Sequence, residues 1–91
     1  MKVRVHCFVS GLVQGVSFRS YVREIGIKLD LTGWVKNLSG GRVEAMAEGE
    51  EKDVERFLEL LKRGSILSRV DEMQTKKEKY EGSLLGFKII L

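Results

Sequence analysis

Two glycines and an arginine are the residues of this sequence best suited to chemistry. They lie in the segment Gly11–Arg19, where an alternating pattern gives way to helical spacing. Glycines in such a turn let backbone N–H groups converge, and the first N–H groups of the following helix have no partner within it. A turn of this kind is a ready binding site for an anion.

Arg19 strengthens this interpretation. A cation in the first turn of a helix faces the positive end of the helix dipole, which is unfavourable unless an anion lies between them. Its guanidinium group suits phosphate oxygens, through charge-assisted hydrogen bonds worth about 1.5–3 kcal/mol each. The alternative is that Gly11 and Gly15 only shape a tight turn and Arg19 points to solvent, since short glycine motifs often arise by chance. No Gly-Lys-Ser/Thr follows the glycines, so a nucleotide–magnesium site is not indicated.

The other reactive residue types have simpler structural interpretations. Cys7 shares an apolar strand face with valines, so we interpret it as a small buried hydrophobe rather than a nucleophile. His6 faces the other side without an obvious acidic or hydroxyl partner in the sequence, and we interpret it as structural or exposed rather than as a general base. Ser17 and Ser20 have no visible acid–base partner. Asn37 taken alone is typical of a strand end or turn.

Hydrophobic periodicity predicts the elements that must position these residues. The expected strands are residues 2–10, 31–38, 42–48, 70–80 and 85–91, and the expected helices are residues 17–29 and 50–63. Ser39-Gly40-Gly41 is expected to form a hairpin turn. The order β-α-β-β-α-β with one additional strand predicts an α+β ferredoxin-like sandwich, in which two helices pack on one face of a mainly antiparallel sheet of four to five strands. Within it, Gly26 weakens the first helix by about 1 kcal/mol relative to alanine, and Trp34 and Phe57 are interpreted as core residues.

Composition limits the classes of protein that this chain can belong to. Its 91 residues are 43% hydrophobic and 32% charged, which excludes a disordered tail and predicts one globular domain over residues 1–91. One cysteine and one histidine cannot form an intramolecular disulfide or a four-ligand zinc site. The net charge of +3 is small and mixed along the chain, which disfavours a nucleic-acid partner. No apolar run approaches the roughly 20 residues of a membrane helix, and Met1–His6 carries no signal-peptide core, so we expect a cytoplasmic protein without a membrane partner.

Two segments together resemble the signatures of the acylphosphatase family. The first is Gly11-x-Val13-Gln14-Gly15-Val16-x-Phe18-Arg19, and the second is Gly33-Trp34-Val35-Lys36-Asn37 followed by Gly41-Arg42-Val43-Glu44. Weaker agreement continues through Gly49-Glu50-Glu51 to Gly86-Phe87-x-Ile89, so the resemblance covers essentially the whole chain.

The resemblance implies an acylphosphatase, a hydrolase that converts small acyl phosphates to a carboxylate and inorganic phosphate without a metal or cofactor. It implies that Arg19 is the phosphate-binding catalytic arginine and that Asn37 positions the attacking water. The implied phosphate cradle is made of the backbone N–H groups of Gln14, Gly15, Val16, Ser17 and Phe18. It also implies a monomer.

The chain departs from the family pattern at three positions, one of them Ser65 where the family often has proline, and two other functions stay open. Gly40 stands where the family commonly has aspartate, and Asp30 where it usually has glycine, although aspartate tolerates a left-handed conformation better than most residues. RNA binding is one alternative, but it needs aromatic side chains on the central strands, and the expected strand 42–48 has none. The other is a phosphate sensor or partner-delivered domain, which would bind phosphate without hydrolysing acetyl or benzoyl phosphate.

Overall fold

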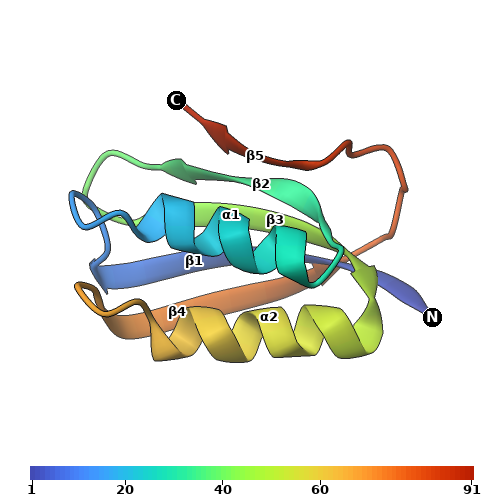
Figure 1. Ribbon diagram of the computed structural model, residues 1–91, viewed down its shortest axis with the longest axis horizontal. Coiled ribbons are helices and arrows are strands. Elements are labelled where there is room, and N and C mark those ends of the chain that lie inside the picture. Colours follow the sequence, from blue (N-terminus) through green and yellow to red (C-terminus); the bar gives the residue numbers. More distant parts are fainter.

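The computed structural model describes all 91 residues, and its two helices cover one face of a five-stranded sheet (Figure 1). The strands are β1 (Lys2–Leu12), β2 (Thr32–Asn37), β3 (Val43–Glu50), β4 (Arg69–Glu78) and β5 (Phe87–Ile90), and the helices are α1 (Phe18–Lys28) and α2 (Glu51–Arg63). The strand order is β4-β1-β3-β2-β5, and every neighbouring pair is antiparallel except β2 with β5. The predicted α+β ferredoxin-like sandwich is confirmed. Neither helix has the length and apolar character needed to cross a membrane.

The first strand continues further than the sequence pattern predicts. Its alternation breaks at Ser10, yet β1 runs on to Leu12 because a register shift between Ser10 and Gly11 lets the strand stay paired with β4. Gly11 has φ 131°, and a Cβ there would lie 2.1 Å from the carbonyl oxygen of Arg69. Gly11 therefore belongs to the β1–β4 pairing, and the turn into α1 begins only after Leu12.

The hydrophobic core lies between the helices and the sheet, where strand residues alternate inward. The buried strand side chains that share this face include Val5, Cys7, Val9, Val35, Val43, Ala45 and Ala47, and the helices contribute Phe18, Val22, Ile25, Val54, Phe57 and Leu61. Cys7 is completely buried, and burial raises the pKa of its thiol to about 12, so it stays a thiol at neutral pH. The interpretation of Cys7 as a core residue rather than a nucleophile is confirmed.

Gly26 lets α1 pack closely on β5. A Cβ at this position would lie 2.2 Å from Cδ2 of Phe87, which is inside the contact distance of two carbon atoms. Gly26 therefore weakens α1 but leaves room for the Phe87 ring to be buried against this helix. The Phe87 ring also packs against Phe57, and the two ring centroids are 5.7 Å apart. This contact holds β5 beside β2, and so brings the end of the chain to the first turn of α1.

No helix covers the opposite face of the sheet, where the structure adds partners for His6 and corrects the interpretation of Trp34. His6 does have acidic partners: its Nε2 lies 2.6 Å from the Glu44 carboxylate and its Nδ1 lies 3.2 Å from that of Glu78. They come from β3 and β4, so the sequence alone did not show them. Trp34 is half-buried on this face with Lys36 Nζ 5.8 Å from its ring centroid, so its assignment to the core is wrong.

A buried carboxylate anchors the connection between β4 and β5. Glu48 on β3 is 1% exposed, and its side chain accepts hydrogen bonds from Arg4 Nε at 2.7 Å and from the backbone N–H groups of Glu81 and Gly82 at 2.9 and 3.2 Å. Burial alone would raise the pKa of Glu48, but these donors and the Arg4 charge outweigh it and lower the pKa below its ordinary value. The glutamate therefore fixes the segment that leads into β5.

We expect Glu48→Gln to lower the free energy of unfolding at neutral pH by about 1–3 kcal/mol, because the neutral amide serves these three donors less well. Since the folded-state pKa is lowered, the contribution of Glu48 is present above the unfolded-state pKa of about 4.3 and is lost as the pH falls through the folded-state value. Urea unfolding at neutral and acidic pH measures both effects, with Glu55→Gln on the exposed side of α2 as the control. Equal acid sensitivity of Glu48→Gln and the unmodified protein would contradict this assignment.

Candidate functional site

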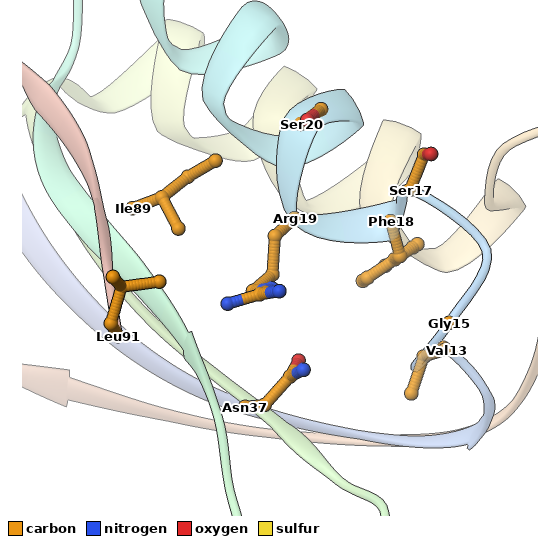
Figure 2. A pocket seen from close by; sticks show the side chains of 9 residues that line it. All are labelled: Val13, Gly15, Ser17, Phe18, Arg19, Ser20, Asn37, Ile89 and Leu91. Atoms are coloured by element: carbon orange, nitrogen blue, oxygen red, sulfur yellow. The ribbon is translucent and has the colours of Figure 1, made fainter.

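A pocket of about 450 Å³ lies at the edge of the sandwich, beneath the first turn of α1 (Figure 2). Its walls come from the β1–α1 loop, the start of α1, the last residue of β2 and the end of β5. The lining residues are Val13, Gly15, Ser17, Phe18, Arg19, Ser20, Asn37, Ile89 and Leu91. The fold thus gathers residues from both ends and the middle of the sequence around one opening.

The β1–α1 loop supplies a row of unpaired backbone donors. None of the backbone N–H groups from Gln14 to Ser20 donates to a protein acceptor, although the loop is held in a defined conformation. Gly15 has φ 75° and Ser17, the residue before α1, has φ 61°, which is uncommon for a residue with a side chain. Such local strain of about 1–3 kcal/mol is typical of functional sites. The free N–H groups are therefore candidate donors to an anion.

Arg19 brings a full positive charge to these donors. It is half-buried on α1, and its guanidinium group points into the pocket toward Asn37 (Figure 2). None of the ion pairs in the structure includes Arg19. The first turn of α1 contains no acidic residue either, so the helix dipole and the arginine add positive potential at the same point. An uncompensated cation in this position favours an anionic ligand.

Asn37 lies at the end of β2 on the side that faces the helices. The alternation of β2 buries Gly33 and Val35 on this side, and Asn37 is the next residue in the same series. Its Oδ1 atom is buried and has no hydrogen-bond partner. Burying a hydrogen-bond acceptor without a donor costs about 1–3 kcal/mol. The buried Oδ1 atom of Asn37 is explained if a ligand or a water in a functional site supplies the missing donor.

The structure places the sequence-predicted site residues in two groups. Arg19, Asn37 and three of the five cradle residues, Gly15, Ser17 and Phe18, line the pocket, whereas Gln14 and Val16 do not. Val16 instead packs against the hydrophobic core.

Gln14 does not line the pocket, and its side chain has a role that the sequence did not indicate. Its Nε2 donates hydrogen bonds to the carbonyl oxygens of Leu38 and Arg42, both at 2.8 Å. These two residues belong to the hairpin that follows Asn37, and Leu38 N–H donates to Arg42 oxygen across it at 2.8 Å. The Gln14 side chain therefore fastens the cradle loop to the strand end that carries Asn37.

Two further lining residues, Ile89 and Leu91, were also missed. Both lie at the end of the last strand, and only the parallel pairing of β5 with β2 brings them to the site, with Ile89 opposite Val35. The apolar alternation of this strand indicates which of its residues share a face, but it does not indicate that the strand lies beside β2.

The lining suits electrostatic binding of an anion. It contains one charged side chain, Arg19, together with the amide of Asn37 and the hydroxyl groups of Ser17 and Ser20. No Asp, Glu, His or Cys side chain lines it. The chain holds no group of three or more His, Cys, Asp or Glu side chains that could bind a metal ion. The site thus has the features of a phosphate-binding pocket in an α+β sandwich.

Comparison with known proteins assigns this chain to a family. The family model of acylphosphatase matches residues 5–89. An acylphosphatase from Syntrophobacter fumaroxidans is 43% identical over 88 residues, covering 97% of this chain and 91% of the relative. The crystal structure of acylphosphatase from Bacillus subtilis superposes with a TM-score of 0.94 at 37% identity, covering 98% of this chain and 99% of that one. The structure of full-length HypF in its phosphate- and nucleotide-bound form also matches, with a TM-score of 0.89 and 36% identity over 99% of this chain and 12% of that one.

The chain therefore belongs to the acylphosphatase family. Its function is that of an acylphosphatase, which makes it a hydrolase.

We expect Gln14→Ala to reduce turnover about tenfold, because a shift of the cradle relative to Asn37 by a fraction of an ångström disturbs the reacting geometry. The free energy of unfolding should fall by about 1 kcal/mol for the lost hydrogen bonds. Initial rates with benzoyl phosphate and urea unfolding measure the two effects. Gln74→Ala on the exposed strand β4 is the matched control and should change neither. Undiminished turnover in Gln14→Ala would show that this link does not position the site.

Proposed function

We propose that this chain hydrolyses the carboxyl–phosphate bond of small acyl phosphates by binding the phosphoryl group between Arg19 and the β1–α1 loop while Asn37 holds the attacking water. The observation that carries the proposal is the meeting of three unsatisfied groups in one pocket. They are a cation without a counter-ion, a row of free N–H donors and a buried amide oxygen without a donor.

Binding of the phosphoryl group follows from the charge of the pocket. The backbone N–H groups of Gln14, Gly15, Val16, Ser17 and Phe18 are the proposed cradle, with Gly15, Ser17 and Phe18 lining the pocket itself. Arg19 adds charge-assisted hydrogen bonds to the phosphate oxygens. Because these donors are held in place before the substrate arrives, they stabilise the charge on the oxygens during transfer without reorganising.

The attacking water is held by the amide of Asn37. If a water hydrogen is donated to Oδ1, a lone pair of the water oxygen is left free to attack phosphorus. As the new P–O bond forms, the bond from phosphorus to the carboxyl oxygen breaks, and that oxygen leaves with the bond electrons as part of the carboxylate. A carboxylate is a good leaving group, so protonation by a general acid is not required.

The proton of the water passes to a phosphate oxygen of the substrate. No Asp, Glu, His or Cys side chain lines the pocket, and His6, the one histidine, lies on the opposite sheet face with Glu44 and Glu78. We propose accordingly that no protein side chain titrates in the chemical step and that neither metal nor cofactor takes part. A kinetic pKa that mutation traced to a side chain would contradict this step.

We also propose the domain organisation, location, oligomeric state and partners of the enzyme. We propose one domain spanning residues 1–91, acting as a cytoplasmic monomer on acyl phosphates, with inorganic phosphate as the product. The uncovered sheet face carries Phe8 and Trp34, but Arg42 and Lys36 lie over these rings and Glu44 is beside them. This mixed charge does not favour a nucleic-acid partner. Turnover separates the enzyme from a domain that only senses phosphate.

We expect Arg19→Gln to lower the turnover of benzoyl phosphate at least 10²–10³-fold, because it removes a preorganised donor from the charged transition state. Inhibition by inorganic phosphate should weaken as well. Rates are measured in excess EDTA, alongside thermal unfolding to show that the variant is folded. Arg23→Gln, on the exposed side of the same helix, is the matched control and should retain full activity. A folded Arg19→Gln variant with normal turnover would refute the proposed role.

For Asn37→Ala, turnover should fall strongly while inhibition by inorganic phosphate stays within a few-fold of normal. Asn37 acts on the water, and a lost interaction of this kind lowers kcat rather than ground-state binding. The comparison with Arg19→Gln separates the two roles. Equal loss of phosphate affinity in both variants would show that the roles are assigned wrongly.

A further inference from the structure

We propose that Ile89 and Leu91 form the binding surface for the acyl group, so that the enzyme favours acyl phosphates with apolar acyl groups over those that carry a second negative charge. The inference rests on the proposed function, because it requires the phosphoryl group to lie in the cradle. It adds a substrate preference that the phosphate-binding residues alone do not provide.

The geometry of β5 brings both side chains to the pocket. Successive residues of a strand point to opposite faces, and Phe87 is buried in the core on the side of the helices. Ile89 packs partly against the same core, and Leu91 follows it in the same series beyond the strand end. Figure 2 shows both side chains on the side of the pocket opposite the β1–α1 loop, with Arg19 between that loop and them.

These two residues supply the apolar surface that a substrate can reach. The other apolar lining residues, Val13 and Phe18, are each only 1% exposed, so they offer a substrate almost no surface. Ile89 is half-buried, and Leu91 is fully exposed. An acyl group that extends from the cradle past Arg19 therefore meets the aliphatic side chains of Ile89 and Leu91, and burying apolar surface between them favours binding.

The charges in the pocket determine which acyl groups bind poorly to this surface. Arg19 is its one charged side chain, and in the proposed complex it is engaged by the phosphoryl group. A second carboxylate or phosphate on the acyl group would lie against Ile89 and Leu91 without a counter-charge, and desolvation of an unpaired charge is unfavourable. Lys88, the cation nearest in sequence, alternates to the other face of the sheet.

The test compares three substrates, benzoyl, acetyl and succinyl phosphate, with the full chain and its variants. The double variant Ile89→Ala/Leu91→Ala should lower the ratio of kcat/KM for benzoyl phosphate to that for acetyl phosphate about tenfold, mainly through KM. It should also reduce the discrimination against succinyl phosphate. Because the ratio is compared between variants, differences in the intrinsic reactivity of the substrates cancel. Inhibition by inorganic phosphate, which carries no acyl group, should stay within about twofold.

Two controls keep the result interpretable. Ile90→Ala removes the same side chain from the same strand on the opposite face, and should leave the ratio unchanged. Leu91→Ala alone carries no risk to folding, since Leu91 is fully exposed, and should lower the ratio by a few-fold. An unchanged ratio in the double variant, or an equal loss for all three substrates, would overturn the inference while leaving the proposed function intact. Absence of turnover of every substrate by the unmodified chain would overturn both.

Discussion

The pocket depends on one electrostatic feature, the positive potential at the turn from β1 into α1. The N–H groups of this turn have no protein acceptor, the helix dipole points its positive end at them, and Arg19 adds a full charge without a counter-ion. Such an arrangement is unfavourable in the free protein, and an anion bound there would relieve it. The backbone at Ser17 is held at φ 61° for this turn, so the loop is organised before the ligand arrives.

The rest of the sandwich holds the other two walls, the ends of β2 and β5, in fixed relation to that turn. The hydrogen bonds of Gln14 fasten the loop to the β2–β3 hairpin, and hence to the strand end of Asn37. Gly26 allows Phe87 to pack under α1, which brings β5 alongside β2 and its last residues to the pocket. In the proposed mechanism, function therefore depends on packing far from the phosphate-binding turn, because Asn37 and the β1–α1 loop reach their places through different strands.

Local pattern predicted much of this arrangement, and long-range pairing accounts for what it missed. The alternation of β1, the amphipathic stripe of α2 and the left-handed turn tolerated at Asp30, φ 58°, are properties of neighbouring residues and could be predicted from the sequence. The partners of His6, the uncovered face of Trp34 and the place of Ile89 depend on which strands lie side by side. Asn37 illustrates both cases, since only a family resemblance distinguished it from an ordinary turn residue, and only the fold sets it opposite Arg19.

In the proposed complex, phosphate binds between Arg19 and the N–H groups of the β1–α1 turn, with Asn37 across the pocket from Arg19. Titration of isotope-labelled protein with inorganic phosphate in excess EDTA, followed residue by residue in heteronuclear NMR spectra, tests this binding mode. The backbone amides from Gly15 to Ser20 and the side-chain amide of Asn37 should shift together and saturate with a single dissociation constant. Shifts centred on the uncovered sheet face, or amides of the loop that stay unchanged at saturating phosphate, would contradict the account.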